Sequence, residues 1–179
     1  MSECAHSQRP EPEDSYALAL GLRLGWGTAH QQWALIGNAP SFAAVLSFES
    51  DYFLSPVLQL GYSTLASEQR SQDLGPPFGV VEVENSLSAL DLLLGPAIEL
   101  GPVRLVLMIG LSDLMVESKV AGREISPDTW VLAYAVELDG WVWGWDWGRL
   151  GLFTNAQFMA EAQLARFGAG LCVDFELGL

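Results

Sequence analysis

Positive charge is scarce in this chain. Its 179 residues include 8 Lys and Arg against 22 Asp and Glu, and the formal net charge is −14. Lys119 is the only lysine. Proteins that bind nucleic acid do so through clustered Lys and Arg, so this balance argues against a nucleic-acid partner.

Long apolar runs are missing too. Half of the residues are hydrophobic and only 17% are charged, yet no apolar run reaches the roughly 18 residues that a membrane helix requires. Polar residues at 28–32 and 37–41 interrupt the uncharged stretch 24–48, and Arg104 interrupts the stretch 100–111. Any insertion into a membrane is therefore expected to use strands.

Metal-ligating side chains are also few. The two cysteines, Cys4 and Cys172, and the two histidines, His6 and His30, are scattered without ligand spacing, so no metal and no cofactor are expected. Two free thiols are favoured over a Cys4–Cys172 disulfide. The glycines of GLRLGWG follow strand spacing, which favours close packing in a small barrel over a phosphate-binding loop.

The chain does contain regular alternation of large and small residues. In YALALGLRLGWG, from Tyr16, every second residue is large and apolar, while the others are Ala, Gly and Arg23. Because side chains of a strand alternate between two faces, one face is suited to lipid and the other to a narrow interior. The opposite face is too poor in charge for a solvated surface, so the pattern predicts a transmembrane β-barrel.

This alternation recurs in eight segments separated by turn signals. The expected strands are Tyr16–Trp26, Phe42–Ser50, Val57–Ala66, Val80–Leu100, Val103–Ser112, Trp130–Asp139, Arg149–Met159 and Ala165–Leu179. Residues 27–41, 67–79 and 113–129 are expected to be long outer loops, and residues 51–56, 101–102 and 140–148 shorter turns at the other rim. The last outer loop, at 160–164, breaks this trend by being short. The fold predicted is an all-β, eight-stranded, antiparallel up-and-down barrel over residues 16–179, with long loops at one rim and short turns at the other.

Two features fit this barrel poorly. Pro96 lacks the N–H that a closed sheet uses. Residues 80–87 place Glu82 and Glu84 on the apolar face, which indicates either a strand projecting beyond the membrane or a bulge that changes the phase.

Residues 1–15 are polar, with Pro10 and Pro12, and are expected to form a disordered tail without a signal peptide. An exported chain would have lost its signal before this start.

The eight segments resemble the small outer-membrane barrels of the OmpA-domain and OmpX kind. The closing segment FGAGLCVDFELGL is similar to the C-terminal assembly signal of such proteins, although it ends in Leu179 rather than in an aromatic residue. The resemblance implies a location in the bacterial outer membrane, embedding in the lipid bilayer or detergent, and recognition of the last strand by the outer-membrane assembly machinery. It implies no single activity, and an extracellular partner stays unknown.

Charged residues fall on the inward face of most expected strands. Glu99 is expected to face Arg104 across one tight turn, and Asp139 to face Arg149 across another. Buried charges must pair, so an interior salt-bridge network that plugs the barrel is favoured over a narrow, cation-preferring pore. The expected network comprises Arg23, Glu49, Asp91, Glu99, Arg104, Glu137, Asp139, Arg149, Arg166, Asp174 and Glu176.

Aromatic residues gather near the ends of the expected strands. Amphipathic rings favour the lipid–water boundary, so two girdles are predicted. Their expected members are Tyr16, Trp26, Tyr52, Trp130, Trp141, Trp143, Trp145 and Trp147.

Two alternatives remain at this point. Outer-membrane acyltransferases place a catalytic His near the outer end of an early strand, and His30 is the only candidate for such a base, although the His-x-Ser spacing of the deacylases is absent. A soluble lipocalin-like barrel with an apolar ligand requires the large apolar faces to point inward. Irregular loops indicate a natural chain, not a designed one.

Overall fold

The computed structural model of the protein describes residues 16–32, 34–50, 54–73, 80–120, 123–125 and 128–177. The expected tail 1–15, with Cys4, lies outside the described residues. The strands are β1 (Tyr16–Gln31), β2 (Ala34–Ser50), β3 (Leu54–Asp73), β4 (Val80–Leu100), β5 (Val103–Val120), β6 (Arg123–Ile125), β7 (Asp128–Trp145), β8 (Gly148–Met159) and β9 (Leu164–Leu177).

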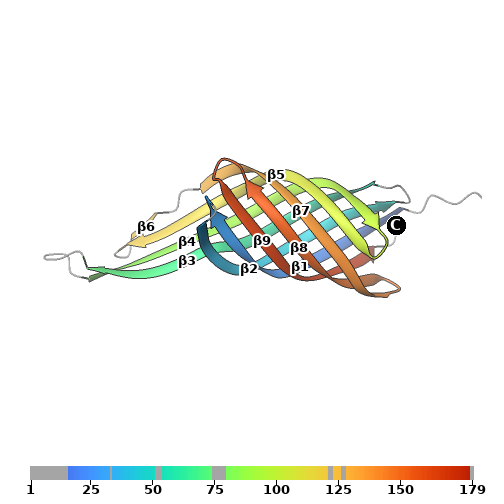
Figure 1. Cartoon of the computed structure of the whole chain (residues 1–179), viewed down its shortest axis with the longest axis horizontal. Coiled ribbons are helices and arrows are strands. Elements are labelled where there is room, and N and C mark those ends of the chain that lie inside the picture. Colours follow the sequence, from blue (N-terminus) through green and yellow to red (C-terminus); the bar gives the residue numbers. More distant parts are fainter. Residues whose placement is uncertain are drawn as a thin grey trace, which may run out of the picture.

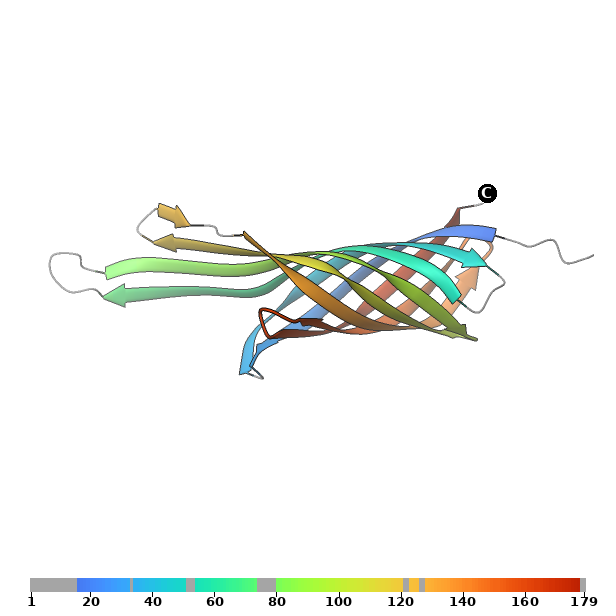
Figure 2. The ribbon, with the colours of Figure 1, turned by 90° about the horizontal axis from the view of Figure 1, so that it is seen from above.

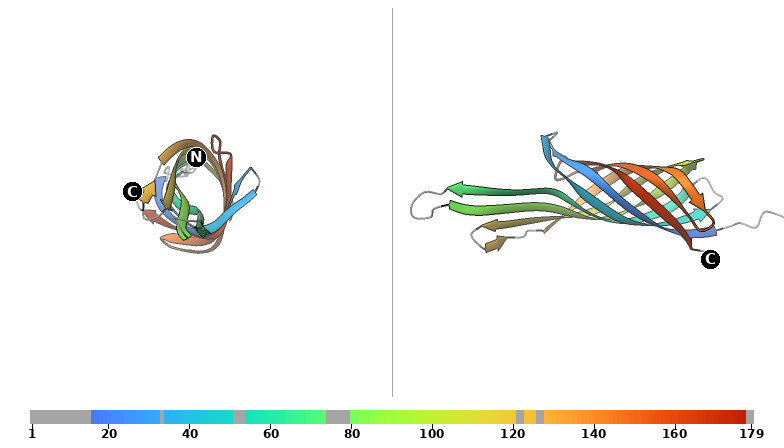
Figure 3. Two further views of the ribbon diagram at one scale, coloured as in Figure 1. Left: turned by 90° about the vertical axis from the view of Figure 1, so that its left-hand side faces the viewer. Right: turned by 90° about the horizontal axis from the view of Figure 1, so that it is seen from below.

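Eight of these strands close into an antiparallel barrel (Figure 1). The order is β4-β3-β2-β1-β9-β8-β7-β5, and pairing of β4 with β5 completes the ring, which is visible end-on in Figure 3. Among the described strands, the short β6 pairs only with β5. The predicted eight-stranded antiparallel barrel is confirmed. We call the end where β1 begins and β9 finishes the terminal end, and the opposite end the extended end.

Alternation of side chains gives the wall an apolar outside and a packed inside. Leu24 and Leu94 on the outer face are 60% and 59% exposed, whereas their inward neighbours Arg23 and Leu93 are 1% and 0% exposed. A closed ring satisfies the backbone hydrogen bonds of every wall strand, so this apolar belt suits a bilayer. The reversed, lipocalin-like arrangement is therefore wrong. No helix capable of crossing a membrane occurs in the described part of the chain.

The expectation of long loops at the extended end is wrong for most of their length. β3 continues to Asp73 and pairs with β4 down to Asp73↔Val80, while β5 continues to Val120 and pairs with β4 and β6. Polar residues outside a membrane form strands when a neighbouring strand satisfies their backbone groups, and hydrophobic alternation does not reveal such strands. β3, β4, β5 and β6 therefore project well beyond the hairpins β1–β2 and β8–β9 (Figure 2).

The two misfits noted in the sequence have structural explanations. Residues 80–87 belong to the projecting part of β4, and the β3–β4 register shifts at Leu65, between Thr64 and Ala66. Pro96 lies inside β4, where the β4–β5 ladder is interrupted between Leu94↔Ile109 and Ala97↔Val106. The missing N–H of proline is thus accommodated by a local break in the wall.

Candidate functional site

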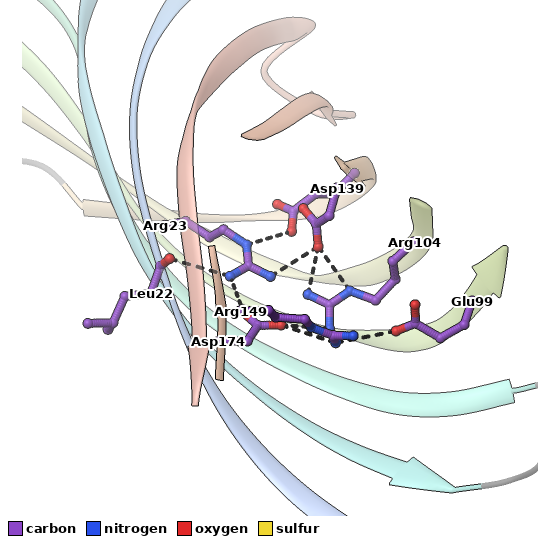
Figure 4. Close-up of polar contacts among 8 residues, drawn as sticks. Leu22, Arg23, Glu99, Arg104, Asp139, Arg149 and Asp174 are labelled. Atoms are coloured by element: carbon purple, nitrogen blue, oxygen red, sulfur yellow. Dashed lines mark hydrogen bonds and ion pairs between the residues drawn. The ribbon is translucent and has the colours of Figure 1, made fainter. Parts of the chain in front are cut away.

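The barrel interior near the terminal end holds a cluster of buried charges, the Arg23–Arg104 cluster (Arg23, Arg104, Glu137, Asp139 and Asp174). Arg23 on β1 donates to three carboxylates: to Asp174 at 2.6 Å, to Asp139 at 3.0 Å and to Glu137 at 3.2 Å (Figure 4). The alternation in the sequence therefore predicted correctly that these charged residues lie on the inward face, and the structure shows which of them form ion pairs.

Arg104 on β5 approaches the same acids from the opposite wall. Its guanidinium lies 2.6 Å from Asp139 and 3.1 Å from Asp174, and both aspartates accept from Arg23 as well. Cross-strand register places Arg104 opposite Asp139 and Gly21 opposite Asp174. A Cβ atom at Gly21 would lie 2.5 Å from the Asp174 carboxylate, so glycine provides the space for this ion pair.

The charges of this cluster do not balance within its five members, which carry two guanidiniums and three carboxylates. Glu137 Oε2 and Asp139 Oδ1 are buried without a hydrogen-bond partner among the described atoms. Arg149, at the terminal rim, adds a third guanidinium and lies 3.4 Å from both Asp174 and Glu99. The rim charges thus extend the network from the lumen toward solvent.

A second group, the Asp91–Arg166 cluster (Ser63, Asp91, Ser112, Gln157 and Arg166), lies toward the extended end. Asp91 accepts from Ser112 at 2.5 Å and from Gln157 at 2.8 Å, and pairs with Arg166 at 3.2 Å. Arg166 also donates to Gln157 at 2.5 Å and to Ser63. The neutral members were missed as network residues in the sequence, although their inward strand positions were the available signal.

Large apolar side chains also occupy the interior. Leu65, Leu93, Met159 and Leu164 are at most 2% exposed and belong to one packed apolar cluster. Sequence reasoning concentrated on charges and missed this contribution. Interior positions of a small barrel are expected to be filled by side chains, and here apolar and ionic groups share that role.

Several expected network members lie elsewhere. Glu176 is exposed at the terminal rim, and the side chain of Glu49 lies outside the described residues. The expected Asp139–Arg149 pairing is wrong: Asp139 lies opposite Phe153, and Arg149 lies opposite Gly144. The expected turn at 140–148 is mostly strand, because β7 continues to Trp145 and β8 begins at Gly148. Glu99 does lie opposite Arg104, as expected.

Trp141 differs from its expected girdle position. The β7–β8 register shifts at Val142, between Trp141 and Trp143, so Trp141 keeps the inward phase of Asp139 and Trp143 turns outward. The Trp141 ring covers two guanidiniums, with Arg149 at 4.0 Å and Arg104 at 5.2 Å from its centroid. Such cation–π contacts place Trp141 over the terminal mouth of the Arg23–Arg104 cluster.

The other aromatic residues divide between the two ends of the wall. Trp143 and Trp147 are 69% and 60% exposed at the terminal end, and Trp26 and Trp130 are 59% and 58% exposed toward the extended end. Trp147 also stacks on Phe175, while Trp145 is half-buried and packs against Trp147. Tyr16 begins β1, and Tyr52 lies outside the described residues.

His30 lies on the outer wall near the extended end of β1. Its Nε2 atom is 3.3 Å from Thr28 Oγ1, and its ring meets Phe167 edge-on at 5.8 Å. Ser50 is at the other end of β2, opposite Tyr16, and Ser112 binds Asp91 in the interior. The described contacts therefore do not assemble His30 with a serine nucleophile. Cys172 is a buried free thiol, and no cluster of three His, Cys, Asp or Glu that fits a metal ion occurs among the described residues.

This fold is that of the small eight-stranded outer-membrane β-barrels. Its similarity to Ail, the attachment invasion locus protein of Yersinia pestis, has a TM-score of 0.59 at 11% identity, over 92% of this chain and 99% of that one. The similarity to Neisserial surface protein A has a TM-score of 0.49 at 10% identity, over 92% and 99% of the chains. No known protein-family model matches the sequence, and no curated protein is significantly similar to it.

Proposed function

We propose that this protein is a bacterial outer-membrane barrel with a plugged lumen, which acts through the sheet that projects beyond its extended end. The observation that carries the proposal is an asymmetry of that sheet. The β2–β3 ladder stops at Ser41↔Ser63, and Gly37 of β2 still lies against the backbone of Leu65 and Ala66, so among the described residues β3 from Ser67 to Asp73 pairs with β4 alone. The opposite edge, β5 from Ser118 to Val120, is covered by β6.

An uncovered strand edge presents a row of free N–H and C=O groups. Natural proteins usually cover such edges, and an edge left open is a template for strand addition by another chain. The uncovered β3 edge runs from Ser67 to Asp73, seven residues, which is sufficient for a strand of ordinary length. We infer that an extended segment of an extracellular partner adds to this edge.

The buried ion pairs and apolar side chains of the interior support a plugged lumen and, with it, a structural or interactive role. Ion pairs of the Arg23–Arg104 cluster cross the barrel near the terminal end, Trp141 covers that end, and buried Leu65 and Met159 belong to the apolar packing inside. A pore needs a continuous polar path, and side chains that pair with each other across the lumen do not leave one. Neither the cation-preferring pore nor an enzyme at His30 gains a specific observation in its favour.

The orientation of the barrel in the membrane is inferred from its even number of strands, and its recognition during assembly from the last strand. β1 begins and β9 finishes at the terminal end, which we assign to the periplasm, so the projecting sheet faces outward from the cell. β9 pairs with both β1 and β8 and closes the ring, and we propose that the outer-membrane assembly machinery recognises this strand.

Strand addition is tested with a labelled ten-residue peptide of alternating Thr and Lys, whose basic residues suit a chain of net charge −14. A shortened variant lacks residues 68–85 and joins Ser67 to Ser86, which are cross-strand partners, through Asn-Gly. We expect the peptide to bind the full chain in micelles and to bind the shortened variant at least fivefold more weakly. A backbone N-methylated peptide of the same sequence is the control for simple charge attraction, and equal binding of both peptides would reject strand addition.

Plugging is tested separately by planar-bilayer recording. We expect no discrete conductance steps from the refolded protein. Reproducible cation-selective steps would refute the plug and support the pore.

A further inference from the structure

The outer wall carries a pocket at the extended end of β1, β8 and β9, apart from the interior clusters. Its volume is about 330 Å³, and it is lined by His30, Gln32, Phe158, Gln163 and Ala165. Phe158 and Ala165 are cross-strand partners whose neighbours Met159 and Leu164 point inward and are buried. The pocket therefore opens on the lipid-facing side of the wall, at the edge of the apolar belt that is nearest the extended end.

Two of the lining residues have an unusual backbone. Gln32 and Gln163 have φ of 48° and 49°, and they are the only non-glycine residues with positive φ in the described part of the chain. The Gln32 N–H donates to the Gln163 carbonyl at 3.3 Å, so the two turns that carry them are joined. Glycine would adopt this conformation without strain. Strained backbone positions of this kind cluster at functional sites, so the carboxamides of Gln32 and Gln163 are candidates for contacts with a ligand.

The chemistry of the lining is polar but uncharged. It combines two carboxamides with the imidazole of His30, which is half-buried against Thr28 and Phe167, and with the Phe158 ring. Among the described residues that line the pocket, none is acidic and none is a lysine or an arginine. Carboxamides donate to and accept from hydroxyl groups, and an aromatic ring provides an apolar surface. This set suits an uncharged sugar ring and offers no ion pair to a phosphate.

A second depression lies on the outer wall, closer to the terminal end than the polar pocket. It has a volume of about 540 Å³, and the small residues Thr154, Ala169 and Gly170 form its floor between bulkier leucines. Thr154 pairs with Ala169, four positions along β8 from the Phe158–Ala165 pair. Four residues of strand span about 13 Å, so the apolar groove begins about 13 Å from the polar pocket, in the direction of the terminal end.

We propose that this wall binds a glycolipid, with an uncharged sugar headgroup in the pocket and an acyl chain in the groove. Three strand pairs lie between the two parts, and of these only Ala156↔Phe167 faces outward, so one amphiphilic molecule can occupy both. The site requires only a barrel embedded in lipid and does not depend on the proposed role of the β3 edge.

The test is native mass spectrometry of the protein released from micelles that contain equal amounts of three lipids with the same acyl chains. These are a monoglucosyl diacylglycerol, a phosphatidylglycerol and a diacylglycerol. Gln163→Gly removes one carboxamide and relieves the left-handed backbone, while Ala169→Leu fills the groove. Ala44→Leu, on the outer face of β2 between Leu22 and Leu60, is the matched control.

We expect the unmodified protein to retain the glucosyl lipid at least fivefold more than either other lipid. Gln163→Gly should abolish this preference, Ala169→Leu should lower retention of all three lipids, and Ala44→Leu should change neither. Gel mobility before and after boiling checks that each variant is folded, and Gln32→Gly, which removes the other carboxamide, replaces the Gln163 variant if that one fails to fold. Equal retention of the three lipids by the unmodified protein, or equal effects of Ala169→Leu and Ala44→Leu, would overturn the proposal. Displacement of the glucosyl lipid by free glucose at the same concentration would also overturn it, because the acyl chain would then contribute nothing.

Discussion

Single side chains decide how charge is accommodated inside this narrow barrel. Arg23 is the centre of the larger cluster because its guanidinium contacts Glu137, Asp139 and Asp174 from one fully buried position. Arg104 shares two of these acids. Each arginine therefore neutralises more than one carboxylate, and the loss of either leaves negative charges facing each other in the interior.

Arg23→Met should be strongly destabilising. The substitution keeps much of the volume but leaves three buried carboxylates with Arg104 as their main partner, and breaking a buried pair typically costs about 3–5 kcal/mol. Arg149→Met is the comparison, because the Arg149 side chain is partly exposed at the rim and its contacts with Glu99 and Asp174 are longer, at 3.4 Å, so a smaller loss is expected. Urea unfolding of both variants in lipid vesicles measures the difference, and equal losses would contradict the central role of Arg23.

The two neighbouring tryptophans on either side of the Val142 bulge should report different surroundings. Trp143 faces outward and is 69% exposed, while Trp141 stacks on Arg149 inside. In vesicles of brominated lipid, we expect Trp143→Phe to remove a quenchable part of the fluorescence and Trp141→Phe to remove a part that bromine quenches poorly. Similar losses of quenchable fluorescence in the two variants would show that Trp141 also faces lipid.

The sequence was informative about the inward face and uninformative about partners. Alternation alone placed Arg23, Arg104 and Asp174 on one face, because a strand has only two faces. The contacts that cross the lumen depend on the register of strands far apart in the chain. A single bulge residue such as Val142 changes that register, and hydrophobicity does not mark it.

At the scale of strands, bulges and glycines shape the wall. The Val142 bulge inserts one residue between two otherwise continuous ladders, and that residue is 74% exposed. Gly95 lies at the break beside Pro96, where the backbones of β4 and β5 come close together. The sequence predicted the membrane-spanning cores of all eight strands, whereas their extensions beyond the belt consist of polar residues without alternation and were taken for loops.

Deletion of Val142 should be tolerated. Without the bulge residue, Trp141 and Trp143 become direct neighbours on β7 and keep their inward and outward directions, so the β7–β8 ladder becomes continuous. Deletion of Leu138, in the regular part of β7, should instead reverse every following side chain and prevent folding. Gel mobility before and after boiling distinguishes the two, and failure of the Val142 deletion to fold would show that the bulge itself is required.

Gly95→Ala should weaken the β4–β5 seam. A Cβ atom at this position would lie 1.8 Å from the Leu107 carbonyl oxygen, a backbone atom, so the two strands would have to separate. We expect a loss of at least about 2 kcal/mol in the free energy of unfolding, comparable to overpacking of a core. Gly144→Ala is the matched control, since its nearest neighbour is 3.9 Å away. Equal unfolding midpoints in urea for the two variants would argue against close approach at the seam.

At the scale of the whole molecule, one sheet forms both the barrel and the part that projects beyond its extended end. The barrel exposes large apolar residues around its belt and depends on lipid or detergent. The projecting part of β3, from Ser67, and its β4 partners lie beyond the contact of Gly37 on β2 with Leu65 and Ala66 on β3. We therefore expect the closed barrel to form without the projection.

This separation is tested by refolding the full chain and the shortened variant, which lacks residues 68–85, into detergent micelles and into plain buffer. With detergent, both should migrate differently on SDS gels before and after boiling, because a closed barrel resists SDS until it is heated. In plain buffer neither should show the shift, because the apolar belt needs lipid or detergent around it and water does not solvate it. A shift of the full chain in plain buffer would mean that the belt is not a lipid-facing surface. A shortened variant that shows no shift in detergent would mean instead that the projecting sheet is needed to close the ring.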